Sequence, residues 1–578
     1  MSKAAQVKAP WLNSRDPEVP ATLTYSELSM CSRVEEMVRR YPDYIAYEFM
    51  GKCTTYAEMW KKINACAKSL KAIGIREGDK VTICMPNAPQ TLCMFYAVNM
   101  VGAIANMVHP LSAESEIAFY LRDSGSVAAI TLDQFYNKFE SVRKAVDLPC
   151  LIITSVADEL KPLMKVGYKL TEGRRNPKVP SGRAGVLSWK EFLRRGEYVE
   201  IYQVRRKAED PAAILYSGGT TGVTKGILLS NRNFNALAAQ IIATNPFFRP
   251  GHKMLAIMPM FHGFGLGVSI HSMVANGGHC ILIPRFTPQS YAELIKKHQP
   301  NLIAGVPSLF EALLRVKEIE GADLSCLLGV FSGGDSLSAE LKKRFDQFLF
   351  DHHATIQVRE GYGLTECVTA SCLTPYHISR EGSIGMPFPD TFYKIVKPGT
   401  EEEVPYGEEG EICLTGPTMM MEYINNPEET ANTLRRHPDG LKWLHTGDLG
   451  MMDADGFIYF RQRIKRMIVT SGYNVYPSQM ENILDAHELV QMSCVIGVPD
   501  PLKMQKVKAF VMLKPGVPAN EETKAVLMAY IRKNVAKYAL PYDIEFRAEL
   551  PKTLVGKVAY RVLEEEELKK LSETAQEQ

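Results

Sequence analysis

The sequence predicts an α/β protein with a large N-terminal domain and a small α+β C-terminal domain. From about residue 30 to 330, amphipathic helical patterns alternate with short β-rich runs, which is typical of largely parallel sheets. After Phe388 short strands and turns dominate, and beyond about residue 460 helices and strands alternate again. Because 578 residues exceed what one compact core holds, more than one folding unit is expected.

The large domain is expected at 1–461 and should contain two parts. Its first part has clear strands at Lys80–Cys84 (KVTIC), Val127–Thr131 (VAAIT) and Cys150–Thr154 (CLIIT). Its second part, about 388–461, should be a β-rich subdomain, because turn-forming segments such as KPGTEEEVPYGEEGEICLTG interrupt its strands.

The small domain is expected at 462–578. Strands are predicted near Ser493–Val498 and Ala509–Lys514, and an amphipathic helix near Glu521–Lys537. No fixed-period repeat is visible, so solenoids and propellers are excluded.

Composition excludes several classes of function. Sixty-seven Lys and Arg against sixty-five Asp and Glu leave a formal charge of +2, so the chain lacks the global field of a nucleic-acid-binding protein. Twelve cysteines without a C-x-x-C pair argue against a zinc site or a disulfide scaffold. The N-terminus lacks the apolar stretch of a secretory signal, and no run approaches the roughly 18 apolar residues of a membrane span. A cytoplasmic protein is expected.

The strongest chemical signal is YSGGTTGVTKG at 216–226, between the apolar run Ala212–Leu215 and the strand-like Ile227–Leu229. Its glycines let backbone N–H groups approach an anion, and its hydroxyl and ammonium groups add donors and charge. The spacing differs from the P-loop pattern. A flexible Gly/Thr hairpin is the alternative, but the density of glycine, hydroxyl and lysine favours a polyphosphate site.

With this loop and further motifs, the sequence resembles the adenylate-forming superfamily of acyl-CoA synthetases, luciferases and peptide-synthetase adenylation domains. The resemblance covers nearly the whole chain, and six ordered matches are far more specific than one. They are FHGFG at 261–265, FSGGDSL at 331–337, EGYGLTE at 360–366, WLHTGD at 443–448, RQRIKRMIVTSGYNVYP at 461–477 and PKTLVGK at 551–557.

The resemblance implies a site for ATP and Mg²⁺. The loop would grip the β- and γ-phosphates through Ser217, Gly218, Gly219, Thr220, Thr221, Gly222, Thr224 and Lys225. The adenine slot would be formed by Gly333 and Gly334 on one side and by Glu360, Gly361, Tyr362 and Gly363 on the other. Thr365 and Glu366 would meet the phosphates and the metal, with Glu366 and Thr220 as metal ligands, since a carboxylate beside a triphosphate is costly without a hard cation between them.

The same resemblance assigns roles to residues later in the chain. Asp448 would bind the ribose hydroxyls, Arg463 would contact the ribose, and Lys465 would add a charge nearby. The alternatives are a turn-capping role for Asp448 and a solvated basic face for Lys465. Lys557 would act in adenylation as a catalytic lysine. His262 would lie between the acid and CoA sites, although a lone histidine is often a core group.

Two features concern the second half-reaction that the resemblance implies. Gly472 and Tyr473 would line a pantetheine channel after the small domain rotates. The superfamily usually has Asp-Arg where this chain has Gln462-Arg463, and the first of the two is the hinge. A glutamine can still serve there, because the role is conformational.

The expected reaction joins a carboxylic acid to CoA through an acyl-adenylate, using ATP. EGYGLTEC, WLHTGD and SGYNVYP are most similar to bacterial long-chain fatty acyl-CoA ligases, and the apolar Phe261, Phe264 and Leu266 suit an alkyl chain but also an aryl ring. An aryl or sterol acid, a carrier-protein acceptor and a non-catalytic nucleotide-binding protein are the alternatives. A homodimer is left open.

The segment Leu160–Leu170 (LKPLMKVGYKL) suggests peripheral contact with the inner membrane face. As a helix it would carry Leu160, Leu163, Met164 and Tyr168 on one stripe and Lys161, Lys165 and Lys169 on another. Pro162 is acceptable in a first turn. A short surface helix in a basic insert is the alternative.

Overall fold

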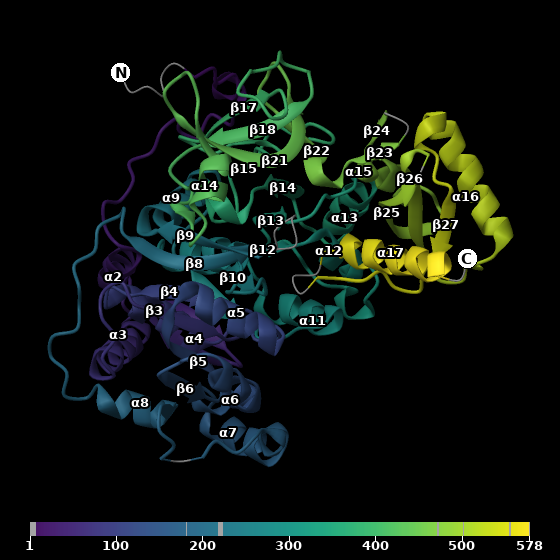
Figure 1. Ribbon diagram of the computed structural model, residues 1–578. Coiled ribbons are helices and arrows are strands. Elements are labelled where there is room, and N and C mark those ends of the chain that lie inside the picture. The colour runs from purple at the N-terminus through teal and green to yellow at the C-terminus, as the bar shows by residue number, and fades with distance from the viewer. Residues whose placement is uncertain are drawn as a thin grey trace.

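The computed structural model describes residues 7–180, 182–217, 224–470, 473–500, 502–553 and 557–576. A large mixed α/β domain and a small C-terminal domain lie side by side, with the chain's last third running from the top of the large domain into the small one (Figure 1). The predicted fold class is confirmed.

The first large sheet has the strand order β19-β9-β8-β4-β3-β5-β6-β7. Its centre is parallel, because β3, β4, β5 and β6 are each followed by a helix that returns the chain to the same edge. The strands are β3 (Lys80–Cys84), β4 (Ile104–Met107), β5 (Ser126–Leu132), β6 (Cys150–Thr154), β7 (Val186–Ser188), β8 (Pro211–Ser217), β9 (Lys225–Ser230) and β19 (Glu422–Tyr423).

The second large sheet has the order β16-β15-β14-β13-β12-β10-β11-β1-β2. Its parallel strands β10 to β14 end at the edge that carries the glycine-rich motifs. The strands are β1 (Ile45–Phe49), β2 (Lys52–Thr55), β10 (Lys253–Ala256), β11 (His279–Leu282), β12 (Leu302–Gly305), β13 (Gly329–Ser332), β14 (Val358–Tyr362), β15 (Cys372–Leu373) and β16 (Met386–Pro387).

Helices of the large domain pack around these sheets, and their starts follow sequence signals. Thr55 caps α3 with a reciprocal capping box to Glu58, and Pro occupies the first turn of α4. The helices are α1 (Trp11–Ser14), α2 (Met30–Arg40), α3 (Tyr56–Ala72), α4 (Pro89–Met100), α5 (Glu114–Ser124), α6 (Tyr136–Ala145), α7 (Pro162–Leu170), α8 (Trp189–Arg195), α9 (Asn231–Ala243), α10 (Ser272–Val274), α11 (Pro288–His298), α12 (Pro307–Leu313), α13 (Ala339–Asp351) and α14 (Pro427–Thr433).

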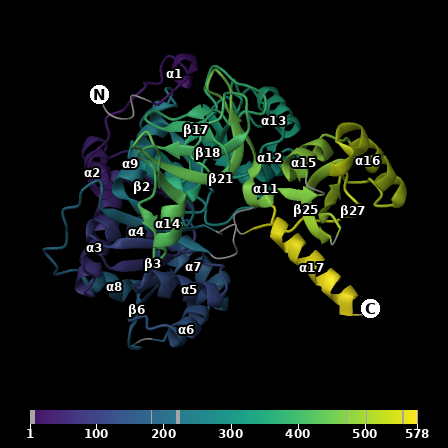
Figure 2. The same ribbon diagram turned by 45° about the horizontal axis from the view of Figure 1, so that its top comes forward.

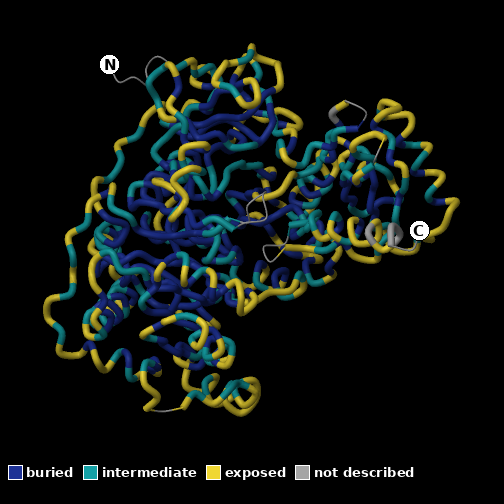
Figure 3. Tube along the Cα trace, viewed as in Figure 1, coloured by how far each residue is buried: buried dark blue, intermediate teal, exposed yellow. Residues whose placement is uncertain are grey.

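The longest apolar run of the sequence, at 92–105, lies in the core of the large domain. Every residue of α4 is buried, because α2 and α3 cover it and the parallel strands lie behind it. The tube view shows the same dark-blue centre (Figure 3). No helix among the described residues is long and apolar enough to cross a bilayer.

The β-rich part and the small domain each have their own sheet. The first is formed by β17 (Phe392–Val396), β18 (Gly410–Thr415), β20 (Leu434–Arg436), β21 (Lys442–Met452) and β22 (Ile458–Arg463). The second is formed by β23 (Ile468–Thr470), β24 (Tyr473–Val475), β25 (Val490–Asp500), β26 (Met504–Leu513) and β27 (Asp543–Phe546), with helices α15 (Pro477–Asp485), α16 (Glu521–Asn534) and α17 (Tyr560–Gln576).

The expected boundary at 461/462 falls within β22, whose residue Gln462 still pairs with Leu449 of β21. The next sheet begins at Ile468 of β23, five residues after β22 ends at Arg463. The exact division therefore stays a prediction. In the view turned by 45°, the small domain with α15, α16 and α17 lies to the right of the large domain (Figure 2).

Candidate active site

A cavity of about 770 Å³ lies where the two large sheets, the β-rich sheet and the small domain meet. The ends of β8, β13 and β14 contribute to it, as do the β21–β22 region and the segment before α17. The predicted site residues that line it are Ser217, Lys225, His262, Gly333, Gly334, Gly361, Tyr362, Gly363, Thr365, Glu366, Arg463, Lys465 and Lys557. The first and last of these residues, Ser217 and Lys557, are 340 positions apart in the sequence, and the fold brings both to one cavity.

The two ends of the predicted phosphate loop are fixed by a strand pair. Ser217 of β8 pairs with Lys225 of β9, and both side chains line the cavity. The Lys225 ammonium forms an ion pair with Glu429 and lies 4.8 Å from the ring centroid of Tyr423. Thr224 is the first described residue after the loop, while Gly218, Gly219, Thr220, Thr221 and Gly222 lie outside the described residues.

Lys225→Ala should raise the KM for ATP by roughly ten-fold or more, because a charge-assisted contact to phosphate is worth about 1.5–3 kcal/mol. Glu429→Gln is the matched control, since it breaks the same ion pair but leaves the ammonium. Steady-state kinetics should show a raised KM for Lys225→Ala alone. Equal changes in both variants would mean that Lys225 serves only to hold Glu429.

Glycines that line the cavity lie at the ends of the parallel strands β13 and β14, where the sequence predicts the adenine slot. At Gly363 an added Cβ would lie 1.8 Å from the carbonyl oxygen of Thr369, so no other residue fits there without moving backbone. At Gly334 the backbone has φ +84°, which a side chain would strain. Tyr362 extends the slot toward β21. Gly333, Gly334, Gly361, Tyr362 and Gly363 all line the cavity, and the binding of adenine between them stays a prediction.

Glu360 lies behind this slot rather than in it. Its carboxylate accepts a hydrogen bond from the Leu337 amide at 3.3 Å, and it is not among the residues that line the cavity. Burial raises the pKa of Glu360 to about 7. In this position Glu360 holds the turn after β13 through the Leu337 amide, and it does not face the cavity.

Glu366 faces the cavity from the short helix at Thr365–Cys367. One of its carboxylate oxygens accepts a hydrogen bond from the hydroxyl of Tyr423, at 2.8 Å. Tyr423 also lies under the Lys225 ammonium, so one tyrosine orients both charged groups. The sequence motifs do not include Tyr423, which belongs to the edge strand β19.

Asp448 is buried, and its two carboxylate oxygens have different surroundings. Oδ2 accepts the Tyr362 hydroxyl at 2.6 Å, whereas Oδ1 has no hydrogen-bond partner among the described residues. The guanidinium of Arg463, opposite Asp448 in the β21–β22 pair, stands 3.5 Å from Oδ1. Burial raises the pKa of Asp448 and the charge of Arg463 opposes that rise. Gly447 and Arg463 line the cavity but Asp448 does not, so its contact with the ribose stays a prediction.

Behind the turn that precedes Asp448 runs a chain of hydrogen bonds that the sequence does not reveal. Glu411 of β18 accepts from the Gly447 amide at 3.0 Å and from His445 Nδ1 at 2.9 Å, and His445 Nε2 lies 2.9 Å from Nε2 of His437. His445 stands in the WLHTGD motif, but Glu411 is 34 residues earlier. Only the pairing of β18 with β21 brings them together.

Lys557 enters the cavity from the small domain. A Cβ built on Gly334 would lie 3.5 Å from its Cε and 4.0 Å from its Nζ, so the ammonium stands beside the slot. Burial lowers the pKa of Lys557, and nearby Asp335 opposes this. Burial also lowers the pKa of His262 to about 3, with a smaller contribution from Lys557. His262 is therefore neutral, and its Nδ1 accepts from the Phe264 amide at 3.2 Å.

Part of the cavity wall is apolar. Of the three residues predicted for the acid pocket, Phe261 and Phe264 line it, whereas Leu266 is fully buried in the core and does not. Residues 264–271 form a π-helix, a rare form that is frequent at functional sites. Further apolar lining residues are Met107, Val108, Ile241, Val268, Phe331, Ala370, Leu373 and Phe388.

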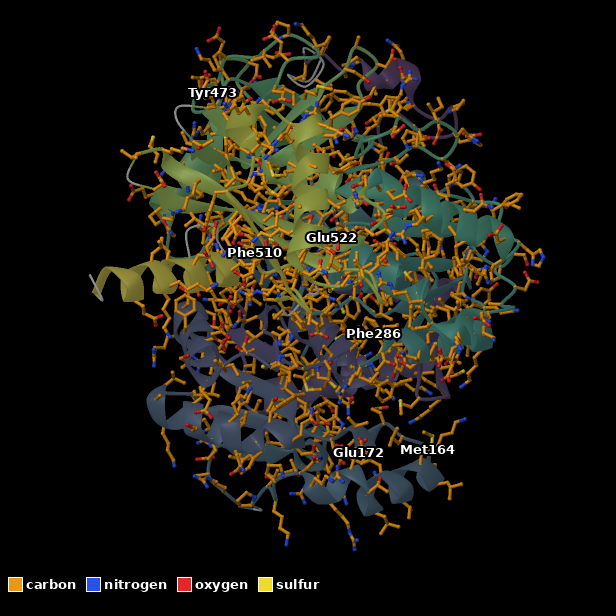
Figure 4. All side chains as sticks on the ribbon, turned by 90° about the vertical axis from the view of Figure 1, so that its right-hand side faces the viewer. Met164, Glu172, Phe286, Tyr473, Phe510 and Glu522 are labelled. Atoms are coloured by element: carbon orange, nitrogen blue, oxygen red, sulfur yellow. The ribbon has the colours of Figure 1, made fainter. Side chains whose placement is uncertain are left out.

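Two predicted residues of the small domain are not brought to the cavity. Gly472 lies outside the described residues, and Tyr473 is 55% exposed and does not line the cavity. The Tyr473 ring is stacked on Tyr538 at 4.4 Å, near the top of the small domain in Figure 4. The expected hinge, Gln462, is fully buried, and neither of its amide atoms has a hydrogen-bond partner among the described residues.

Glycines of the large domain and a lysine of the small domain line one cavity, an arrangement typical of an enzyme whose site lies between two domains. The chain belongs to the AMP-binding enzyme family: the family model matches residues 34–424, and the model of the AMP-binding enzyme C-terminal domain matches 479–557.

Among curated relatives, the chain is similar to the long-chain-fatty-acid–CoA ligase of Bacillus subtilis (strain 168), with 35% identity over 97% of this chain and 99% of the relative. Among solved structures, it is similar to an anthranilate CoA ligase in complex with anthranoyl-AMP, with 25% identity, a TM-score of 0.81 and coverage of 94% of this chain and 97% of the other.

A third likeness concerns the fold alone. MatB from Rhodopseudomonas palustris, 24% identical, matches 93% of this chain and 99% of its own, with a TM-score of 0.80 for its ATP-bound structure and 0.71 for its apo structure.

Proposed function

We propose that the protein is an ATP-dependent fatty acid–CoA ligase that forms an acyl-adenylate and then an acyl-CoA thioester. The observation that carries this proposal is that apolar side chains, the glycines of the predicted nucleotide slot and Lys557, which stands beside Gly334, all line one cavity. The relatives named as long-chain-fatty-acid–CoA ligases support the same substrates.

In the first step an oxygen of the acid's carboxylate attacks the α-phosphorus of ATP, the bond to the bridging oxygen breaks, and diphosphate leaves. Two anions must meet in this step, so positioned positive charge supplies most of the rate enhancement. Lys557 stands where it can contact both the carboxylate and the α-phosphate. Asp448 and Arg463 would hold the ribose, which fixes the distance between the α-phosphorus and the acid.

Mg²⁺ fits the residues beside the phosphate region. Magnesium is commonly bound by one or two carboxylates, with phosphates and waters completing its shell. Glu366 offers one such carboxylate. Its Oε1 accepts the hydrogen bond from Tyr423, and its Oε2 would be the oxygen that binds the ion. The ion would neutralise charge on the leaving diphosphate; Thr220, the other predicted ligand, lies outside the described residues.

In the second step the CoA sulfur attacks the carbonyl carbon of the acyl-adenylate, the thiol proton is released, and AMP leaves. For this step the small domain must turn, since Tyr473 now lies on an exposed surface away from the cavity. We expect the small domain to be mobile, with Gln462 as its hinge. The buried Gln462 amide has no hydrogen-bond partner among the described residues, so it would gain hydrogen bonds if this part of β22 were released. A homodimer stays a prediction.

The preferred acid should be a medium- or long-chain fatty acid. Each buried CH₂ contributes about 0.8 kcal/mol, so kcat/KM should rise severalfold per methylene until the apolar region is filled. The measurement is AMP release from a panel of C2–C18, aryl and sterol acids. A clear preference for acetate, benzoate or coumarate over dodecanoate would contradict the fatty-acid assignment.

The same assay separates the remaining alternatives. A CoA ligase turns over rapidly only when free CoA is present, whereas an enzyme that loads a carrier protein stops at the adenylate. A non-catalytic nucleotide-binding protein releases no AMP under either condition.

A further inference from the structure

Helix α7 and the short helical turn Glu172–Arg175 form a basic, partly apolar knob on the outside of the large domain. It lies at the bottom of Figure 1, and the tube view marks it as mostly exposed (Figure 3). Met164 and Glu172, labelled near the lower edge of Figure 4, belong to it. The cavity described above does not include any residue of this knob.

The exposed apolar stripe of α7 differs from the one predicted from sequence. Leu160 precedes the helix and is buried, and Tyr168 packs against the core. The outward stripe consists of Leu163, Val166 and Leu170, which are 85%, 57% and 59% exposed and follow i, i+3, i+7 spacing. Three large apolar side chains standing together in water are unusual unless something covers them.

Positive charge surrounds this stripe. Between residues 161 and 180 there are six basic side chains and one acidic one, Glu172, which leaves a local charge of 6 − 1 = +5 in a chain whose total is +2. None of the six has a salt-bridge partner among the described residues. They are Lys161, Lys165, Lys169, Arg174, Arg175 and Lys178.

The knob is held in a fixed position. Asn176 donates to the Tyr168 hydroxyl at 3.2 Å and to Asp133 at 2.8 Å, which ties the segment after α7 both to the helix and to the edge of the large domain. Little ordering is therefore needed when a partner binds. The rigid combination of apolar side chains and unpaired cations is a surface for a partner that is both apolar and anionic.

We propose that α7 and the following turn dock the protein on an anionic lipid bilayer. Leu163, Val166 and Leu170 would enter the boundary between headgroups and acyl chains, while the surrounding cations contact lipid phosphates and carboxylates. A nucleic acid would match the charge but would leave the apolar stripe in water. Docking there brings the ligase to the phase in which long-chain acids dissolve.

The test is co-sedimentation of the full-length protein with phosphatidylcholine vesicles, with and without 30% phosphatidylserine, at low and high salt. We expect binding only to the anionic vesicles and release by salt. The variant K165E/K169E/R175E should lower the partition coefficient on the order of 100-fold, because each basic residue near the surface contributes roughly five-fold. The variant L163S/V166S/L170S should weaken binding at least ten-fold.

The matched control is K514E/R532E/K533E, which makes the same change of charge at three exposed positions of the small domain. It should bind vesicles as the unmodified protein does. Undiminished binding by either α7 variant, or an equal loss in the control, would overturn the proposal, as would binding to heparin without binding to vesicles. The assay measures binding alone, so its result is independent of the ligase activity.

Discussion

Replacing Lys557 by alanine should abolish most adenylation while leaving thioester formation nearly intact. The lysine reaches the nucleotide slot from the small domain, beside Gly334 and near His262. Loss of one preorganised charge contact in a buried site costs two orders of magnitude or more in rate. Because the second step requires another face of the small domain, Lys557 should be absent from it.

The two half-reactions can be measured separately, with ATP plus acid for the first and synthetic acyl-AMP plus CoA for the second. Lys552→Ala is the matched control, since Lys552 is an exposed lysine in the same segment that does not line the cavity. It should retain both activities. Equal losses in both half-reactions of Lys557→Ala would mean that this lysine supports the fold or CoA binding.

Asp448→Ala should lower kcat/KM for ATP on the order of 100-fold and remove the preference for a ribose hydroxyl. The Oδ1 atom is buried, lies 3.5 Å from the Arg463 guanidinium and has no hydrogen-bond partner among the described residues, so we expect a ribose hydroxyl to donate to it. A hydrogen bond to a charged group contributes about 1.5–3 kcal/mol. The unmodified protein should therefore favour ATP over 2′-deoxy-ATP or 3′-deoxy-ATP by ten-fold or more, and the variant should hardly distinguish them.

Asp453→Ala is the control for the alternative role of Asp448 as a turn-capping residue. Asp453 caps the β21–β22 turn, accepting from the amides of Asp455 and Phe457 and from the Tyr459 hydroxyl. Its loss should lower the melting temperature but keep the preference for ATP. If Asp448→Ala behaves like Asp453→Ala, with a lower melting temperature and unchanged nucleotide preference, the ribose role is wrong.

The turn that carries Asp448 shows what sequence motifs miss. WLHTGD identifies Asp448, but nothing in it indicates that Glu411 accepts hydrogen bonds from both Gly447 and His445. Likewise Tyr423, which orients Glu366, stands outside every recognised motif. These residues are positioned by strand pairing between distant segments, and a motif read along the chain does not contain such pairing.

The sequence by itself determined the local elements and the kinds of chemistry. Apolar runs gave strands within a few residues, as at Lys80–Cys84 and Cys150–Thr154, because burial on both faces of a parallel sheet demands continuous apolar side chains. Glycine motifs indicated anion and base binding, because only glycine permits such close backbone approach, as Gly363 does beside Thr369.

Only the tertiary structure decided which of these groups meet. In the structure Leu266 lies in the core, Glu360 does not line the cavity, and Leu160 is buried and not part of the exposed stripe of α7. The burial of a side chain depends on the neighbouring elements that pack against it and not on its residue type alone. The tertiary structure also brought Lys557 to Gly334, a contact across more than 200 positions that depends on how two separately folded domains pack against each other. Helical periodicity fixes which side chains share a face, but the direction of that face is set by the neighbouring elements.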